Sequence, residues 1–198
     1  SSDLHSMNLK KKTKSFTEET FEPSKSELIV KNSRFSSQDL MKEMSKVSEA
    51  TEYTSYLIFK FNPVKSKLVN IGKDGYRLNS NSVIWDNNAK KIKIWLIGGT
   101  EAFGYVNTDE ETISSILEQK LNDENSKFQF EVKNHGVFGY ASTQQLIKFR
   151  LDLIEQKPDM IIVMNGFNDY KISWKYQSIF ATDLYTHIYL DRKSTRLN

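Results

Sequence analysis

Three strand-like segments alternate with two helix-like segments between residues 91 and 164, and this order constrains the fold more than any other feature of the chain. The strands are expected at residues 92–97, 128–132 and 160–164. The last is a continuous apolar run, which is typical of a central parallel strand. A β-α-β-α-β order gives a parallel sheet with right-handed crossovers. The sequence therefore predicts an α/β domain over residues 91–198.

Each connecting helix is expected to begin at a capping box, in which a hydroxyl residue precedes Glu or Gln by three positions. The boxes are Thr108 with Glu111 and Ser142 with Gln145, and the second helix should end near Lys157. The apolar positions expected on the buried faces are Ile113, Ile116, Leu117 and Leu121 in the first helix, and Leu146, Ile147, Phe149, Leu153 and Ile154 in the second. Their spacing is that of an amphipathic helix.

The part of the chain before residue 91 shows weaker patterns. Residues 1–35 are rich in Ser, Lys and Glu without a period, so we expect a largely irregular tail. Residues 36–90 are expected to form a small N-terminal extension with a helix at 37–50 and short strands. The apolar positions of that helix are Leu40, Met41, Met44 and Val47.

The strands of this extension are predicted from turn signals. Residues 56–61 form an apolar, aromatic run that stops at Asn62-Pro63, and residues 67–78 resemble a hairpin that turns at Asp74-Gly75. Residues 79–91 are polar and are expected to be a loop, with a possible short strand at 83–85.

Composition excludes several classes of site. The chain has no cysteine, so disulfides and thiolate metal sites are excluded, and its three histidines are not spaced as ligands on one element. We therefore expect no metal and no cofactor. The 28 basic and 25 acidic residues give a net charge of +3, which favours no nucleic-acid partner. The basic run at 10–14 lacks interleaved aromatic residues and is expected to be a solvated tail.

Membrane insertion and secretion signals are also not indicated. No apolar run reaches the roughly 20 residues that a membrane-spanning helix needs. The N-terminal basic cluster is not followed by the apolar segment of a secretory signal. Oligomeric state and compartment are left open by the sequence.

The three loops that follow the predicted strands are rich in Gly, Asn and hydroxyl groups. They are Gly98-Gly99-Thr100, residues 134–140 (NHGVFGY) and residues 165–170 (NGFNDY). Sites in parallel sheets form beyond the carboxyl ends of the strands, so these loops should meet in one small volume. A phosphate-binding loop fits poorly, because GGTEAFG has neither the glycine spacing nor the lysine of the known motifs.

These loops resemble the first three sequence blocks of the SGNH (GDSL-like) hydrolases. The matching segments are GGTEAFG, NHGVFGY and GFNDY, and the upstream VNIGKDGYR is similar to a Gly-Phe-Arg segment that often precedes the first block. The resemblance covers residues 68–170, about half of the chain. It implies a three-layer, flavodoxin-like α/β fold with a parallel sheet.

The resemblance also implies ester hydrolysis by a hydroxyl nucleophile that a histidine activates and an oxyanion hole assists. Thr100 stands at the nucleophile position, and Gly139 and Asn168 stand at the oxyanion-hole positions. The supporting positions of the three blocks are Gly99, Asn134, Gly136, Gly166 and Asp169. The implied substrate is a small-molecule or carbohydrate ester.

Two departures from the family pattern predict that this chain by itself is inactive. Thr100 replaces the family's serine, and its extra methyl restricts the side chain, while Glu101 adds a negative charge if it turns inward. The family's Asp-x-x-His block has no match, because Asp183 and His187 are one residue too far apart and too early. His135 is expected near the site but not as the base. We therefore expect a truncated SGNH-like domain.

Three functions remain open from the sequence. The first is a carboxylesterase or acetylesterase of the SGNH type, and the second is an inactive module of the same fold that binds acylated carbohydrate. The third, a flavodoxin-like nucleotide binder, would be expected to bind a flavin or nucleotide. An Asp-x-x-His segment in a longer natural chain would favour the first over the second.

Overall fold

The computed structural model describes residues 35–80, 86, 89–124 and 127–176 of the chain. The chain divides into two compact units, Ser1–Asp39 and Leu40–Asn198. Most of the tail predicted for residues 1–35, the short strand predicted at 83–85 and the Asp183–His187 pair lie outside the described residues. The domain boundaries suggested by the sequence stay predictions.

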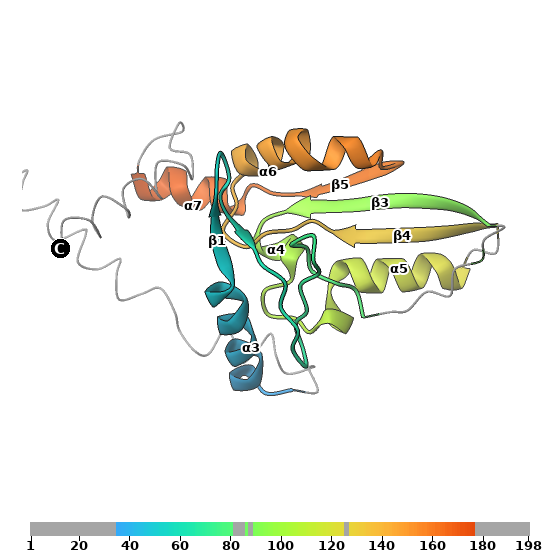
Figure 1. The fold of residues 1–198 in the computed structure, drawn as a ribbon, viewed down its shortest axis with the longest axis horizontal. Coiled ribbons are helices and arrows are strands. Elements are labelled where there is room, and N and C mark those ends of the chain that lie inside the picture. Colours follow the sequence, from blue (N-terminus) through green and yellow to red (C-terminus); the bar gives the residue numbers. More distant parts are fainter. Residues whose placement is uncertain (1–34, 81–85, 87–88, 125–126, 177–198) are drawn as a thin grey trace, which may run out of the picture. The chain divides into compact units, whose positions relative to one another are not determined.

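The second unit contains a three-stranded parallel sheet, as the alternation of strands and helices predicted. Its strands are β3 (Lys90–Gly98), β4 (Phe128–Asn134) and β5 (Met160–Met164), in the order β4-β3-β5. Leu96 stands beside Asn134 on one side and Ile162 on the other. All three strands run in the same direction, so their carboxyl ends lie at one edge of the sheet (Figure 1). The α/β class is confirmed.

The prediction that β5 is a central strand was wrong for the described residues, where β5 pairs with β3 alone. Its side chains Met160, Ile161 and Val163 are exposed, Val163 by 57%. An apolar run shows that a strand suits burial on both faces, but it does not determine how many strands lie beside it.

Helices cover the two faces of the sheet. Helix α5 (Ile113–Glu124) connects β3 to β4, and α6 (Ser142–Lys148) begins the connection from β4 to β5. Figure 1 shows α5 and α6 on opposite sides of the sheet. The remaining elements here are α4 (Thr100–Phe103), the 3-10 turn η1 (Asp109–Glu111), the π turn η2 (Phe149–Leu153), the 3-10 turn η3 (Ile154–Gln156) and α7 (Phe167–Tyr176).

The buried face of α5 differs from the predicted one. Ile113 and Ile116 are exposed, whereas Ser114, Ser115 and Glu118 are buried. The predicted capping box forms, because both the backbone N–H and the hydroxyl of Thr108 donate to the Glu111 carboxylate; it introduces η1 before the helix starts. Ser115 donates to the carbonyl of Asp109, the first residue of this turn, which holds the polar side of α5 inward.

Polar side chains of α5 pair with the outer edge of β4. Glu118 accepts a hydrogen bond from the Val132 N–H at 2.7 Å, and the Asn122 amide bonds both the N–H and the carbonyl of Phe130. Asn79 donates to the Val132 carbonyl at 2.6 Å. These side chains take the place of a neighbouring strand for Phe130 and Val132, whose outward backbone groups are thereby satisfied.

Helix α6 starts one residue earlier than the predicted capping box. Ala141 is the N-cap, and Gln144 rather than Gln145 accepts the Ala141 N–H, at 3.2 Å. The predicted apolar face is only partly buried: Leu153 is fully buried, whereas Leu146 and Ile154 are exposed. The segment ends as predicted, because Lys157 takes a left-handed conformation after η3.

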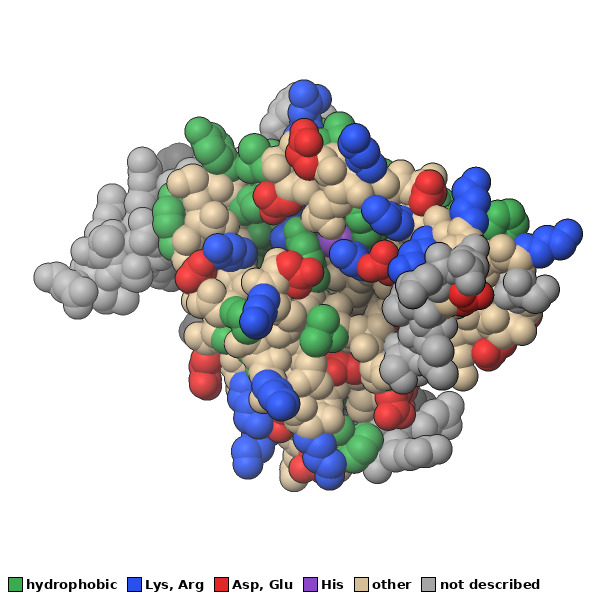
Figure 2. Space-filling model, turned by 45° about the vertical axis from the view of Figure 1, so that its right-hand side comes forward, with side chains coloured by type: hydrophobic (Ala, Val, Ile, Leu, Met, Phe, Trp, Pro, Cys, Tyr) green, Lys and Arg blue, Asp and Glu red, His purple; other side chains and the backbone are tan. Residues whose placement is uncertain are grey.

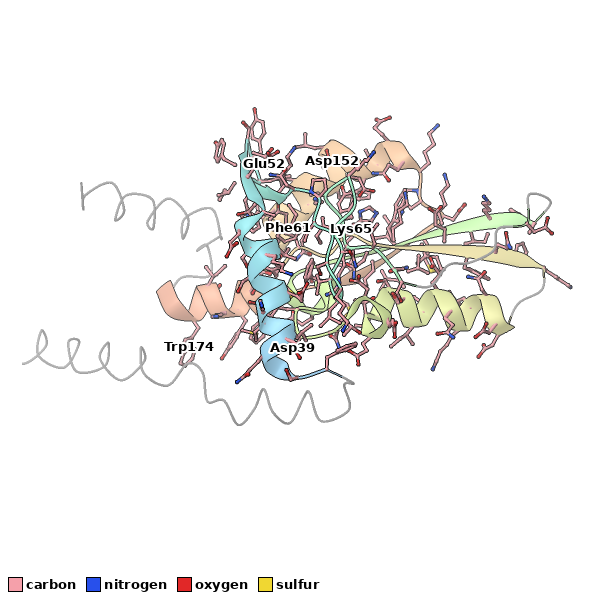
Figure 3. All side chains as sticks on the ribbon, turned by 60° about the horizontal axis from the view of Figure 1, so that its bottom comes forward. Asp39, Glu52, Phe61, Lys65, Asp152 and Trp174 are labelled. Carbon is pink, nitrogen blue, oxygen red and sulfur yellow. The ribbon has the colours of Figure 1, made fainter. Side chains whose placement is uncertain are left out.

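The N-terminal extension contains α3 (Ser37–Glu49) and a two-stranded antiparallel sheet of β1 (Thr51–Thr54) and β2 (Ile58–Phe61). Helix α3 forms as predicted, with Leu40, Met44 and Val47 buried and Met41 exposed. Strand β1 was not predicted, and β2 is shorter than expected, because residues 55–57 form the turn between the strands. Phe61 of β2 is buried, and Figure 3 labels it together with Trp174, which lies near the carboxyl end of α7.

The hairpin predicted at residues 67–78 forms only as a tight turn with isolated bridges. The Gly75 N–H donates to the Gly72 carbonyl at 3.0 Å, and Gly75 has a φ of 78°. Ile71 bridges both Val64 and Arg77.

On the face drawn in Figure 2, basic and acidic side chains are interspersed. None of the described helices is long and apolar enough to cross a membrane.

Candidate functional site

Thr100 lies at the carboxyl end of β3, where the strand turns directly into α4. Gly99 is the N-cap of this short helix, and Gly104 ends it in a left-handed conformation with a φ of 75°. A side chain at Gly98 would place its Cβ 2.1 Å from the Met164 carbonyl oxygen and 2.5 Å from the Ala102 Cβ. Only glycine fits there, and this close approach fixes the turn that presents Thr100.

The structure brings Gly139 to Thr100. The Gly139 N–H donates a hydrogen bond to the Thr100 hydroxyl oxygen, with a distance of 3.3 Å between the nitrogen and the oxygen. Gly139 has a φ of 85°, a conformation that L side chains rarely adopt. The geometry points this backbone N–H toward the space beside the hydroxyl.

Asn168 lies beside Gly99. A Cβ at Gly99 would be 2.9 Å from the Asn168 amide nitrogen and 3.1 Å from the Tyr140 carbonyl oxygen. The Asn168 amide donates to that carbonyl at 2.8 Å. An amide nitrogen carries two hydrogens, so one N–H of Asn168 remains in addition to the one that Tyr140 accepts.

Asp169 ties the third loop to the start of α6. Its carboxylate accepts hydrogen bonds from the Ser142 backbone N–H, at 3.1 Å, and from the Ser142 hydroxyl. A carboxylate at a helix N-terminus is stabilised by the unpaired N–H groups there. Asp169 therefore holds its neighbour Asn168 in place rather than facing Thr100.

The second loop is fixed behind the site by Asn134 and Gly136. Asn134 is buried, accepts the Gly136 N–H at 3.0 Å and donates to the Ser114 hydroxyl at 3.1 Å. A Cβ at Gly136 would lie 2.3 Å from the Phe103 backbone nitrogen, so this loop packs directly on α4. Gly166 has a φ of 106° and open space around it.

Arg77 braces α4 from outside the three loops. Its guanidinium donates to the carbonyls of Phe103, Gly104 and Asn107, and it forms a buried ion pair with Asp109 at 3.0 Å. Phe103 and Gly104 are the last residue and the C-cap of the helix that starts at Thr100. The Arg of the VNIGKDGYR segment therefore supports the turn that carries Thr100, which the sequence alone did not indicate.

His135 lies in the second loop but is not available as a base. Its side chain is fully buried between the rings of Tyr76, at 4.1 Å between centroids, and Trp95, at 5.3 Å. Neither ring nitrogen has a hydrogen-bond partner among the residues that the structure describes. Burial, and secondarily the charges of Lys148 and Lys133, lower the pKa of His135 to about 3, so the imidazole is neutral at neutral pH.

No described carboxylate or histidine hydrogen-bonds to the Thr100 hydroxyl. Glu101 is exposed, and one of its carboxylate oxygens lies 3.6 Å from the position of a Cβ at Gly99. Its side chain therefore turns back toward the site. Within residues 35–80, 86, 89–124 and 127–176, no three potential metal ligands are grouped as an ion would require.

Comparison with known proteins gives a partial structural likeness. The chain is similar to AlinE4, an SGNH-hydrolase family esterase, with a TM-score of 0.37 and 26% sequence identity over 41% of this chain and 43% of that one. A mutant of the same esterase matches with a TM-score of 0.36 over the same shares. Less than half of the esterase's length is thus covered. No family model and no curated protein matches the chain.

Proposed function

We propose that this chain carries the ester-binding and acyl-transfer site of an SGNH-type hydrolase, a carboxylesterase or acetylesterase, with Thr100 at the nucleophile position. The observation that supports this most directly is the hydrogen bond from the Gly139 N–H to the Thr100 hydroxyl at 3.3 Å. When a hydroxyl attacks an ester, the carbonyl oxygen becomes negative within about 3 Å of the attacking atom and needs donors there. Gly139 supplies such a donor.

Two further groups would complete the oxyanion hole. The Thr100 backbone N–H begins α4 and so has no partner within that helix. The second N–H of Asn168 would be the other donor, because the amide nitrogen is 2.9 Å from the position of a Cβ on Gly99, the residue next to Thr100. A neutral amide and two backbone groups stabilise a negative oxygen without the desolvation cost of a lysine.

Proton transfer limits the activity that we expect. The Thr100 hydroxyl needs a base to attack, and the described residues place none beside it. Turnover by this chain should therefore be slow or absent. The alternative function, a module that binds acylated carbohydrate without hydrolysing it, is supported by the same observation.

The first test is binding of an acetate ester, measured by saturation-transfer NMR with triacetin. We expect binding by the wild-type chain and its loss in Gly99→Ala, because the new Cβ would displace the Asn168 amide. Gly72→Ala is the control, since the three atoms nearest to a Cβ there belong to the side chains of Asp74 and Leu78 rather than to the site. Absence of triacetin binding by the folded wild-type chain would refute both functions.

The second test is hydrolysis of p-nitrophenyl acetate, compared with a Thr100→Ala control. We expect no turnover above the control, and none in Thr100→Ser, because the missing base rather than the threonine methyl limits the reaction. Binding without turnover would leave the binding module as the function of this chain. A Thr100-dependent rate would instead show a hydrolase whose base lies outside the described residues.

A further inference from the structure

One face of the β1–β2 hairpin is aromatic. Tyr53 of β1 stands directly opposite Phe59 of β2, so both side chains project from the same face. Phe61 follows two positions later on that face and is only 2% exposed, whereas Tyr53 is 79% exposed and Phe59 is intermediate. We refer to Tyr53 and Phe59 as the aromatic platform, which continues from the buried Phe61 outward into solvent.

The platform is attached to the loop that carries Gly139. The Phe59 ring carbon Cζ is 3.7 Å from the position that a Cβ on Gly139 would take. The Tyr140 ring meets the Phe59 ring edge-on, with centroids 5.1 Å apart, and the Tyr140 hydroxyl donates to the Phe59 carbonyl. The Gln144 amide donates to the Leu57 carbonyl at 2.9 Å. The platform therefore keeps a fixed position relative to Gly139.

The turn of the hairpin is strained. Tyr56 has a φ of 67° and Ile58 a φ of 74°, although neither is a glycine and Ile58 is β-branched. Such conformations persist only where surrounding contacts impose them, and they concentrate at functional sites. Here Leu57 is buried between them and its carbonyl is bonded by Gln144. The strain indicates that the hairpin is held in this position against its local preference.

We propose that the aromatic platform binds a ring in the ester substrate and so determines specificity; this rests on the function proposed above. An ester whose carbonyl oxygen points at the Gly139 N–H places one of its two substituents beside Phe59, because that ring lies against Gly139. A flat ring with an apolar face packs well on an aromatic side chain. Tyr53 extends the contact outward by one further ring.

The openness of the platform selects among ring types. Because Tyr53 is mostly exposed, a ring that lies on it keeps one face or edge in water. A pyranose presents C–H groups on one face and polar substituents at its edge, and an aryl group presents a flat apolar face. The shared chemistry is a six-membered ring attached near the ester carbonyl, and the experiment separates its two sources.

The experiment compares three acetate esters by saturation-transfer NMR and titration. Methyl tri-O-acetyl-β-xylopyranoside and triacetin carry the same number of acetates with and without a ring, and phenyl acetate supplies an aryl ring. We expect the ester whose ring the platform accepts, either the xylopyranoside or phenyl acetate, to bind about tenfold more tightly than triacetin. Tyr53→Ala and Phe59→Leu should each reduce that affinity about three- to tenfold, and Tyr53→Ala, which does not touch the loop of Gly139, should leave triacetin binding unchanged. Tyr56→Ala is the control, since this exposed tyrosine lies in the turn outside the paired register.

Each outcome is decisive. Loss of ring preference in both platform variants supports the proposal, and the ester that loses affinity identifies the ring as a pyranose or an aryl group. Equal affinity of wild-type protein for triacetin and both ring esters, or no effect of Tyr53→Ala, overturns the platform while leaving the ester site intact. If none of the three esters binds, the function proposed above fails together with the platform.

Discussion

The Arg77–Asp109 ion pair offers the sharpest test of how the site is held together. The Arg77 side chain is fully buried, its Nε lies 3.0 Å from the Asp109 carboxylate, and its other nitrogens donate to three backbone carbonyls around the end of α4. Arg77→Met removes the charge and these donors together. It leaves a buried carboxylate that still accepts two hydrogen bonds from Asn70, and it removes a donor from three carbonyls, of which that of Gly104 still accepts the Asn107 N–H.

The expected cost follows from these contacts. Breaking a buried ion pair by removing one partner costs about 3–5 kcal/mol, so we expect Arg77→Met to lower the free energy of unfolding by about 4 kcal/mol. At roughly 2–4 °C per kcal/mol for a chain of this size, the melting temperature should fall by about 8–16 °C. Arg77→Lys keeps the charge but not the planar fork, and its loss should be about half as large.

Asp109 gives this prediction a pH signature. Burial raises the pKa of Asp109 above its ordinary value, and Arg77 acts against that rise. Without Arg77 the pKa of Asp109 should rise further. Between the pKa of Asp109 in the unfolded chain and its higher value in the folded variant, the folded form therefore holds a proton that the unfolded form has lost. Stability of the variant then falls as pH increases through that range. The difference between wild type and Arg77→Met should therefore be smaller at pH 4.5 than at pH 7.

Urea unfolding followed by tryptophan fluorescence and circular dichroism measures these differences. Asp109→Asn and the double variant complete a thermodynamic cycle, and we expect a coupling energy of at least about 1 kcal/mol because the residues are in contact. Lys60→Met, which breaks the exposed pair with Glu52, is the control and should not move the unfolding midpoint. A loss below about 1 kcal/mol in Arg77→Met would refute the brace.

Two further predictions concern the second loop. Because burial lowers the pKa of His135 to about 3, the unfolded chain binds a proton that the folded chain does not, and stability should fall by up to about 1.4 kcal/mol per unit as pH drops below about 6.5. Urea titrations from pH 7 to 4 should show a smaller dependence in His135→Phe, and equal slopes would show that the imidazole is accessible. Gly136→Ala should lower stability by more than about 2 kcal/mol, because its Cβ would lie 2.3 Å from the Phe103 nitrogen; thermal unfolding that instead matches the milder Gly72→Ala would contradict the close packing of this loop.

The sequence by itself determined the elements whose pattern is local. The alternation of apolar runs and capping signals placed β3, β4, β5 and the helices between them to within a few residues, because strand and helix periods are set by neighbouring positions. The same alternation implied that the loops after the strands share one edge of the sheet. Thr100, Gly139 and Asn168 were named within those loops by the resemblance of GGTEAFG, NHGVFGY and GFNDY to the SGNH sequence blocks, not by the alternation itself.

The tertiary structure decided which surfaces are buried. The apolar spacing of α5 favoured Ile113 and Ile116 as core residues, yet the helix buries Ser115 and Glu118, because their hydrogen bonds to η1 and to β4 hold that side inward. The apolar run of β5 likewise did not reveal that the described sheet ends there. Periodicity specifies a helix or strand, but the partner surface specifies the face that it buries.

Contacts between distant parts of the chain were beyond the sequence for the same reason. The Phe59 carbonyl accepts a hydrogen bond from Tyr140, which lies 81 positions away in the sequence. Arg77 donates to the carbonyls of Phe103 and Gly104 at the end of α4, which are 26 and 27 positions away. Nothing in the local residues of the hairpin predicts that its aromatic face meets Gly139. Such contacts depend on how the elements pack, and packing is a property of the whole domain rather than of any segment.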